Sequence, residues 1–265
     1  MFSRVWALLR NEITKALRCR LPYFGLFGAA LLCVIIFVVA DELSSSNENN
    51  AWGYVTLSMQ LVFTDIGLIF ILVFSALLMA DETRSGTIRA MLAAPLYRGE
   101  FYLAKAAMGL LYMIVISIAT LVLSMALSSV HYRFGAISDS FGVIYSQGKV
   151  LGNFLLAFLL AWIPLGALVL YGLFISTIIR SPGAAVAVSI GTLYIIDFTK
   201  HLVGLDPYVF TRYISYPWQI MQQIAQGVDY QWHPEVWKMV GLCCLYGVVA
   251  FGAGLLIFLR QDLND

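Results

Sequence analysis

The sequence has few charged residues. Only 12% of its 265 residues are charged, whereas 61% are hydrophobic and the mean hydropathy is +0.85. A soluble globular domain has about 25% charged residues, so this chain lacks the polar surface that a water-facing globule needs. We therefore predict an integral membrane protein. The net charge of +1 also gives no basic excess, so we expect no nucleic acid as a partner.

Signatures of catalysis and metal binding are also missing. No GxxxxGK[ST] phosphate-binding loop occurs, so we expect this chain to lack ATPase activity. The three histidines are scattered without an HExxH pair, and the four cysteines lack metal-ligand spacing. We therefore expect no metal and no cofactor on this chain. A membrane-embedded enzyme would need clustered Asp, His or Ser groups at membrane depth, and the sequence indicates none.

Six apolar stretches are long enough to cross a membrane, for which a helix needs about 20 mostly apolar residues. We predict an all-α integral membrane protein with six transmembrane helices in a single domain, residues 1–265. The predicted spans are residues 21–40, 57–80, 106–129, 151–175, 183–203 and 237–259.

Residues 1–20 precede the first span and have an amphipathic pattern. Leu9 and Ile13 recur at helical spacing, while Arg10, Glu12, Lys15 and Arg18 take the other side. This pattern predicts a helix on the inner membrane surface, with its cations near anionic lipid headgroups. A plain basic flank that only sets the topology is the alternative. With six spans, most lysines and arginines of the connections fall on the same side of the membrane as the N-terminus. Because such residues are enriched on the cytoplasmic side, this predicts an inner (cytoplasmic) membrane protein with both termini cytoplasmic.

The inner loop 81–105 carries the most informative pattern. Gly86 permits a tight turn out of the preceding span, Thr87 can cap a short helix, and Pro95 ends it. Such a loop predicts a short rigid helix under the bilayer, on which a partner protein can push. Ile88, Met91 and Leu92 would share one face of this helix, with Arg89 turned away.

The pattern Glu82…Gly86-Thr87-Ile88…Leu92…Pro95…Arg98…Lys105 resembles the inner loop of ABC-2 type transporter permeases. The resemblance extends over essentially the whole chain, including the surface helix before the first span. It implies a coupling helix that docks on an ABC-type ATP-binding subunit, which would carry the ATP and Mg²⁺. The expected coupling residues are Glu82, Gly86, Thr87, Ile88, Arg89, Leu92 and Arg98.

Two aspartates lie within predicted spans, where a charge is costly and functional by default. Asp197 has Lys200 and His201 at i+3 and i+4, so a local ion pair could neutralise it. Asp65 has no cation near it in the sequence. For both we predict a place on a translocation path or at a helix interface. A snorkelling or protonated carboxyl group is the alternative for Asp65.

The outer segment 204–234 is rich in tyrosine and tryptophan, which favour the membrane–water boundary. Ile220, Met221 and Ile224 repeat at helical spacing. We predict one or two short re-entrant helices that form an outer lid or grip a periplasmic or other outer-surface partner. A disordered loop is the alternative, although such loops are poor in aromatic residues.

These features favour the membrane-spanning subunit of an ATP-driven ABC transporter, an exporter, that works with a second permease copy or a homologue. The alternative is a secondary transporter or channel driven by an ion gradient, with Asp65 and Asp197 as ion sites. The long structured inner loop and the absence of repeat symmetry argue against that alternative. Cargoes in the resembling family include drugs, lipids, polysaccharides, peptides and ions, and some members transmit motion instead.

Overall fold

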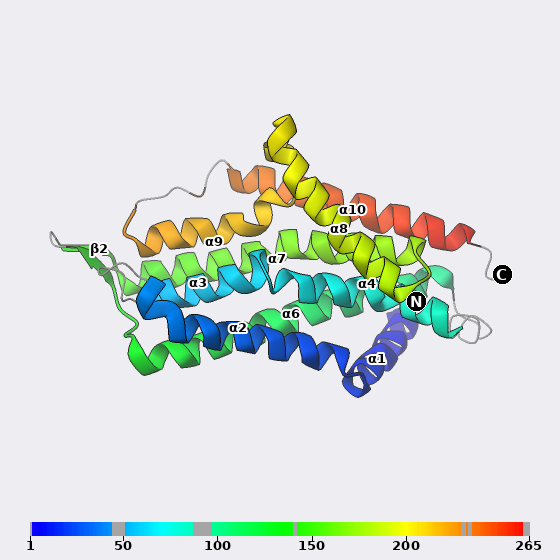
Figure 1. Ribbon diagram of the computed structural model, residues 1–265, viewed down its shortest axis with the longest axis horizontal. Helices are drawn as coiled ribbons and strands as arrows, with labels where there is room; N and C mark the ends of the chain where they lie inside the picture. Colours follow the sequence, from blue (N-terminus) through cyan, green and yellow to red (C-terminus); the bar gives the residue numbers. More distant parts are fainter. Residues whose placement is uncertain are drawn as a thin grey trace.

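Long apolar helices make up most of the protein, as the computed structural model shows (Figure 1). The structure describes residues 2–43, 51–86, 97–139, 142–228, 232 and 235–261. The elements are α1 (Phe2–Arg18), α2 (Leu21–Leu43), α3 (Ala51–Thr64), α4 (Leu68–Ser85), α6 (Arg98–His131), β1 (Ile137–Asp139), β2 (Gly142–Tyr145), α7 (Gln147–Ile178), α8 (Pro182–Val203), the 3₁₀ turn η1 (Asp206–Tyr208), α9 (Arg212–Ala225) and α10 (Glu235–Arg260).

Six helical segments of the described chain are long and apolar enough to cross a membrane. They confirm the predicted all-α membrane protein with six spans. Several are longer than a bilayer requires: α6 has 34 residues, or about 51 Å at 1.5 Å per residue, against a hydrocarbon core of about 30 Å. The segments are Leu21–Val39, Ala51–Ser85, Arg98–Val130, Gln147–Ile178, Pro182–Lys200 and Glu235–Arg260.

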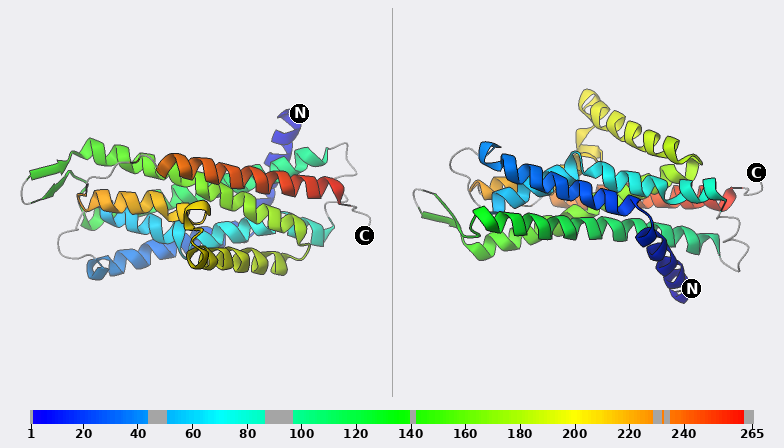
Figure 2. Two further views of the ribbon diagram at one scale, coloured as in Figure 1. Left: turned by 90° about the horizontal axis from the view of Figure 1, so that it is seen from above. Right: turned by 60° about the horizontal axis from the view of Figure 1, so that its bottom comes forward.

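The bundle has two distinct ends (Figures 1 and 2). Helix α1 and the end of α10 lie toward one end, together with the end of α4 and the start of α6, and we call this the terminal end. The opposite end carries the hairpin of β1 and β2, and we call it the hairpin end. An even number of spans places both termini on the same side, so the arrangement agrees with six crossings.

The second span is interrupted. Helix α3 ends at Thr64 and α4 begins at Leu68, so Asp65–Gly67 form a break inside a segment that the sequence predicts as one continuous helix. At Gly67 an added Cβ atom would lie 2.2 Å from the carbonyl oxygen of Val62, which no real side chain could tolerate. Only glycine therefore fits this close approach of the backbone to itself. We refer to Asp65–Gly67 as the α3–α4 break.

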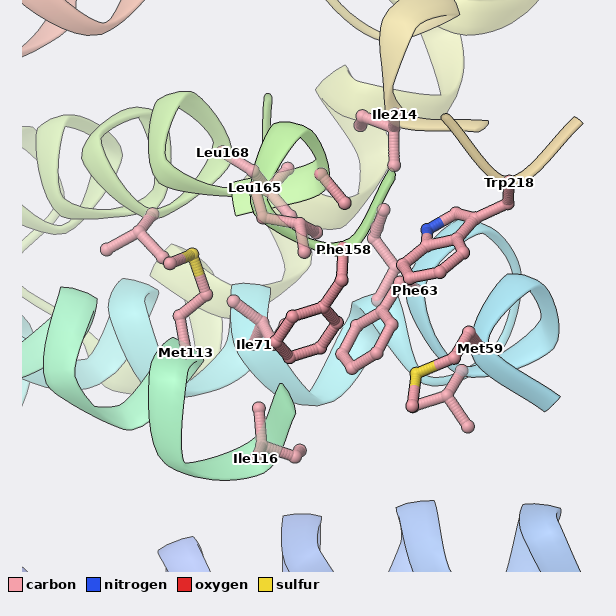
Figure 3. Packing of buried hydrophobic residues seen from close by; sticks show 14 of the residues in the cluster. Met59, Phe63, Ile71, Met113, Ile116, Phe158, Leu165, Leu168, Ile214 and Trp218 are labelled. Carbon is pink, nitrogen blue, oxygen red and sulfur yellow. The ribbon is translucent and has the colours of Figure 1, made fainter. Parts of the chain in front are cut away.

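Helix α7 lies at the centre of the bundle and packs against α4, α9 and α10. Its contact with α4 is close, because a Cβ atom on Gly172 would lie 2.1 Å from the Ser75 hydroxyl oxygen. Figure 3 shows the buried side chains between α3, α4, α6, α7 and α9. Trp218 of α9 stacks on Phe63 of α3, with ring centroids 6.2 Å apart. This apolar packing fixes α9 against the half of the bundle nearer the hairpin end.

The outer segment between α8 and α10 is helical in its described part. It begins with η1 and continues as α9, whose apolar face is buried against α3 and α7. The helical spacing of Ile220, Met221 and Ile224 reflects this packing, since all three side chains are buried. A re-entrant position in the outer leaflet stays a prediction. The antiparallel β1–β2 hairpin, in which Ile137 pairs with Tyr145, was not predicted from the sequence.

Candidate functional site

Four charged side chains meet at the terminal end, where they join three helices. Lys105 of α6 contacts both Glu12 of α1 (Nζ to Oε2, 2.6 Å) and Glu82 of α4 (Nζ to Oε1, 2.9 Å). Lys15 of α1 contacts the same two carboxylates, at 2.8 Å from Glu82 and 3.3 Å from Glu12. We call Glu12, Lys15, Glu82 and Lys105 the charge network. Its two acids and two bases balance.

The charge network is largely buried. The Lys105 side chain is only 3% exposed, and those of Glu12 and Glu82 are 8% and 10% exposed. Lys15 is nearer the surface. Burial alone would lower the pKa of Lys15, but the hydrogen bond to Glu82 and the charges of Glu12 and Glu82 together raise it above the usual 10.5. The two carboxylates therefore favour the charged form of Lys15.

The amphipathic pattern of α1 explains how Glu12 reaches this position. Leu9, Ile13 and Ala16 pack against the core, and Glu12 lies among them on the same side of the helix. The periodicity predicted that Glu12 and Lys15 both lie on the polar face of α1, and for Glu12 this is wrong, because its side chain is buried on the apolar face. Lys15 turns toward Glu82 and away from lipid headgroups. One signal in the sequence could have revealed the network: Glu12 precedes Lys15 by three residues and lies next to the apolar position Ile13.

Arg98 ties the start of α6 to the end of α10. Its Nη1 donates to the carbonyl oxygens of Leu259 at 3.1 Å and Gln261 at 2.9 Å. The Gln261 amide in turn donates to the carbonyl oxygen of Thr177 at the end of α7, at 2.9 Å. Carbonyl groups at a helix C-terminus lack partners within the helix, and a nearby cation is favourable there. Arg98, predicted as a coupling residue, therefore also joins three helices within the chain.

Gly86 ends α4 in a left-handed conformation with φ of +69°, and its backbone N–H donates to the Thr83 carbonyl oxygen at 3.3 Å. This conformation is the usual glycine stop of a helix. The expected coupling residues Thr87, Ile88, Arg89 and Leu92 lie outside the described residues. Of the predicted coupling set, the structure thus describes Glu82, Gly86 and Arg98, which flank that segment.

A second group of charges lines a cavity of about 510 Å³ beside the α3–α4 break. Its walls come from α3, α4, α8, η1 and α9. Asp65 and Asp197, which are 132 residues apart in sequence, both line it. We call this space the break cavity.

The break cavity holds a chain of ion pairs on one side. Lys200 is buried and contacts Asp197 at 2.5 Å, the Thr211 hydroxyl at 3.2 Å and Asp206 at 3.8 Å. Arg212 contacts the other Asp206 oxygen at 2.7 Å. The pair of Asp197 and Lys200 has the i, i+3 spacing that the sequence suggested. Asp206 and Arg212 carried no signal in the sequence analysis, because their approach depends on the turn at η1.

Asp65 lines the break cavity from the α3–α4 break, and its side chain is exposed. The Thr64 hydroxyl donates to it at 3.2 Å. In the part of the chain that the structure describes, no basic side chain forms an ion pair with Asp65. One turn earlier, the Gln60 side-chain oxygen is buried without a hydrogen-bond partner among the described residues.

The sequence profile of a protein family described as ABC-2 family transporter protein matches residues 8–196. The matched part begins in α1 and ends in α8, so it contains the whole charge network and Asp65. A search of curated proteins finds no match. The family implies an ABC-type ATP-binding partner and a dimeric arrangement. Since the match covers most of the chain, the protein belongs to the ABC-2 family of transporter proteins and is a multi-pass transmembrane subunit of an ABC transporter rather than its ATPase.

Proposed function

We propose that the protein couples ATP hydrolysis by a separate subunit to export across the inner (cytoplasmic) membrane, with its terminal end in the cytoplasm. The ATP-binding subunit, which carries ATP and Mg²⁺, docks on the inner loop 81–105. The observation that carries the proposal is the charge network, because it joins α1, α4 and α6 at the two flanks of this loop. Export is the direction that the resemblance to ABC-2 permeases supports.

The connections around the loop support a mechanical role. A push on residues 87–96 enters α4 through Gly86 and α6 through Arg98. Lys105 binds Glu82 and Glu12 together, so the adjoining ends of α1, α4 and α6 move as one body. Arg98 links that body to the ends of α10 and α7. A displacement at the loop is therefore passed to most of the bundle.

Helix α4 carries this displacement to the break cavity. It has 18 residues, or about 27 Å, and runs from the charge network to the α3–α4 break. Because α3 and α4 are separate helices, α4 can shift against α3 at Asp65–Gly67. The break cavity, with Asp65 and Asp197, then forms part of the translocation path. Helix α9 forms its outer lid, and a second permease copy or homologue completes the path.

An ion-gradient-driven transporter is the second candidate, and one observation favours it. Asp65 and Asp197 line the same cavity, as two carboxylates of an ion site would. The flanking contacts of the inner loop have no role in that alternative, so we rank it second.

Isolation of the native complex tests the proposal. The full chain is purified from its own membranes in mild detergent and then reconstituted in liposomes. We expect an ATP-binding chain to co-purify, and we expect Glu82→Gln to lower the ATPase activity that the assembled complex supports. A chain that purifies alone and moves solute on a proton or sodium gradient without ATP would contradict the proposal and support the second candidate.

A further inference from the structure

We propose that the break cavity binds the amino group of a cationic organic molecule, with Asp65 as its counter-ion. The inference rests on the proposed function in one respect, because it names the class of cargo that would occupy this part of the path. It starts from the unequal distribution of charge around the cavity.

The charges of the cavity wall leave one negative charge unbalanced. Three aspartates and two basic residues line the cavity: Asp65, Asp197, Asp206, Lys200 and Arg212. The two cations lie on the α8 and α9 side, where they contact Asp197 and Asp206. Asp65 lines the same cavity from the α3–α4 break and forms no ion pair within the described chain. A cleft with this excess of negative charge attracts cations.

The hydrogen-bonding groups of the cavity favour a ligand that donates hydrogen bonds. The buried Gln60 side-chain oxygen has no hydrogen-bond partner in the described part of the chain, and a buried acceptor of this kind is uncommon in native proteins. Gln60 and Asp65 both line the cavity, and both offer oxygen acceptors. An ammonium group carries a positive charge and several N–H donors, so it can satisfy both groups at once.

The size and the remaining lining favour an organic cation over an inorganic ion. A volume of about 510 Å³ lies in the range of small-molecule sites, about 300–1,000 Å³. Leu68, Leu193 and Ile214 give the cavity apolar contacts for a hydrocarbon body, and the Tyr194 ring can lie against a cation. Among the described residues no group of three or more His, Cys, Asp or Glu side chains could hold a metal ion.

The position of the cavity also suits a site that changes during a transport cycle. Asp65 belongs to the α3–α4 break, while Leu68 is the first residue of α4. A shift of α4 therefore moves one wall of the cavity relative to Lys200 of α8 and Arg212 of α9. Such a shift would change the separation between the amine's counter-ion and the two wall cations.

A pair of matched probes tests the proposal. The full chain is placed in nanodiscs of zwitterionic phosphatidylcholine, and binding of dansylcadaverine, a fluorescent primary amine, is measured after subtracting empty nanodiscs. The control ligand is its N-acetyl derivative, which keeps the same body without the charge. We expect the amine to bind about tenfold more tightly than the neutral derivative. Equal binding of the two ligands would overturn the proposal.

Substitutions then locate the site. Asp65→Asn keeps the size of the side chain and removes its charge, so we expect about a tenfold loss of amine affinity with no change for the neutral ligand. Gln60→Leu removes one hydrogen-bond acceptor and should lower the amine affinity by a smaller factor. Asp81→Asn makes the same chemical change at the terminal end and should leave binding unaltered. Full affinity in both Asp65→Asn and Gln60→Leu would overturn the assignment, and the ligand comparison in the native chain stands even if one variant fails to fold.

The binding measurement separates this inference from the proposed function. It needs no ATP and no ATP-binding subunit, so amine binding that depends on Asp65 supports the inference even if transport proves independent of ATP. Conversely, ATP-dependent export with no preference for the amine would leave the proposed function in place and remove the inference. Displacement of the probe by sodium ions at equal potency with organic amines would indicate an ion site instead.

Discussion

The charge network and the break cavity are both mixtures of acidic and basic side chains within a largely apolar bundle. In the charge network two carboxylates and two ammonium groups balance, and Lys105, the residue that joins them, is almost fully buried. In the break cavity three carboxylates accompany two basic groups, Asp65 is exposed, and the Asp197 side chain is 46% exposed. A balanced, buried set holds helices together, whereas an unbalanced, open set can accept a charged ligand.

The two regions also differ in the parts of the chain that they join. The charge network connects α1, α4 and α6 near one end of each helix, and none of the three is interrupted at the network. The break cavity lies where helices end or begin: α3 at Thr64, α4 at Leu68 and α9 at Arg212. A continuous helix transmits a displacement along its length, whereas a break between two helices allows one helix to shift relative to the other. This difference predicts that substitutions in the network change stability and coupling, while substitutions in the cavity change binding.

Lys105→Met should give the largest effect. It removes the buried cation that two carboxylates share, and breaking one partner of a buried ion pair costs about 3–5 kcal/mol. We expect a loss of this order in the free energy of unfolding, measured in mixed micelles by tryptophan fluorescence. The double variant Lys105→Met with Glu82→Gln leaves Glu12 and Lys15 as a balanced pair, so it should be more stable than Lys105→Met alone. If the single variant is as stable as the native chain, the network does not hold the three helices.

Gly67→Ala should come next, because the new Cβ atom would lie 2.2 Å from the Val62 carbonyl oxygen. Relieving that overlap requires the backbone of the α3–α4 break to move, and overpacking of this kind costs about 1–3 kcal/mol. The control is Gly191→Ala in α8, where nothing lies within 4 Å of an added Cβ atom. A native-like unfolding midpoint for Gly67→Ala would show that the break does not depend on the close approach.

The sequence predicted the six spans but not the interruption of the second span, for a physical reason. Hydropathy sums apolar residues over a window, so it finds the six spans but cannot show that the backbone turns at Gly67. Likewise, the periodicity of α1 predicted a surface helix, yet the burial of Glu12 depends on which face packs against α6. Asp65 and Asp197 could each be singled out by their charge, but their meeting at one cavity depends on helix packing. The predicted coupling helix stays a prediction, because Thr87–Leu92 lie outside the described residues.

Arg98→Ala should have a moderate effect on stability and a larger one on coupling. It removes two hydrogen bonds from a charged donor to the end of α10, and we expect a loss of about 1–2 kcal/mol since the contact is partly exposed. The reconstituted complex should retain ATP hydrolysis while transport per ATP hydrolysed falls. Arg98→Lys keeps the charge but lacks the planar guanidinium, so it should recover only part of the coupling. Unchanged transport per ATP in Arg98→Ala would remove this contact from force transmission.

Asp65→Asn should have the smallest effect on stability. Its carboxylate is exposed and, in the described chain, contacts only the Thr64 hydroxyl, so the free energy of unfolding should change by no more than about 0.5 kcal/mol. Asp197→Asn in α8 is the matched comparison at the same cavity. It removes the partner of the buried Lys200 and should destabilise the chain more, even though the chemical change is the same. The same unfolding measurement in mixed micelles, made on both variants, decides between the two outcomes. If Asp65→Asn lowers the free energy of unfolding as much as Asp197→Asn does, Asp65 is a structural residue. The contrast between a balanced network and an open cavity would then fail at the residue on which it depends most.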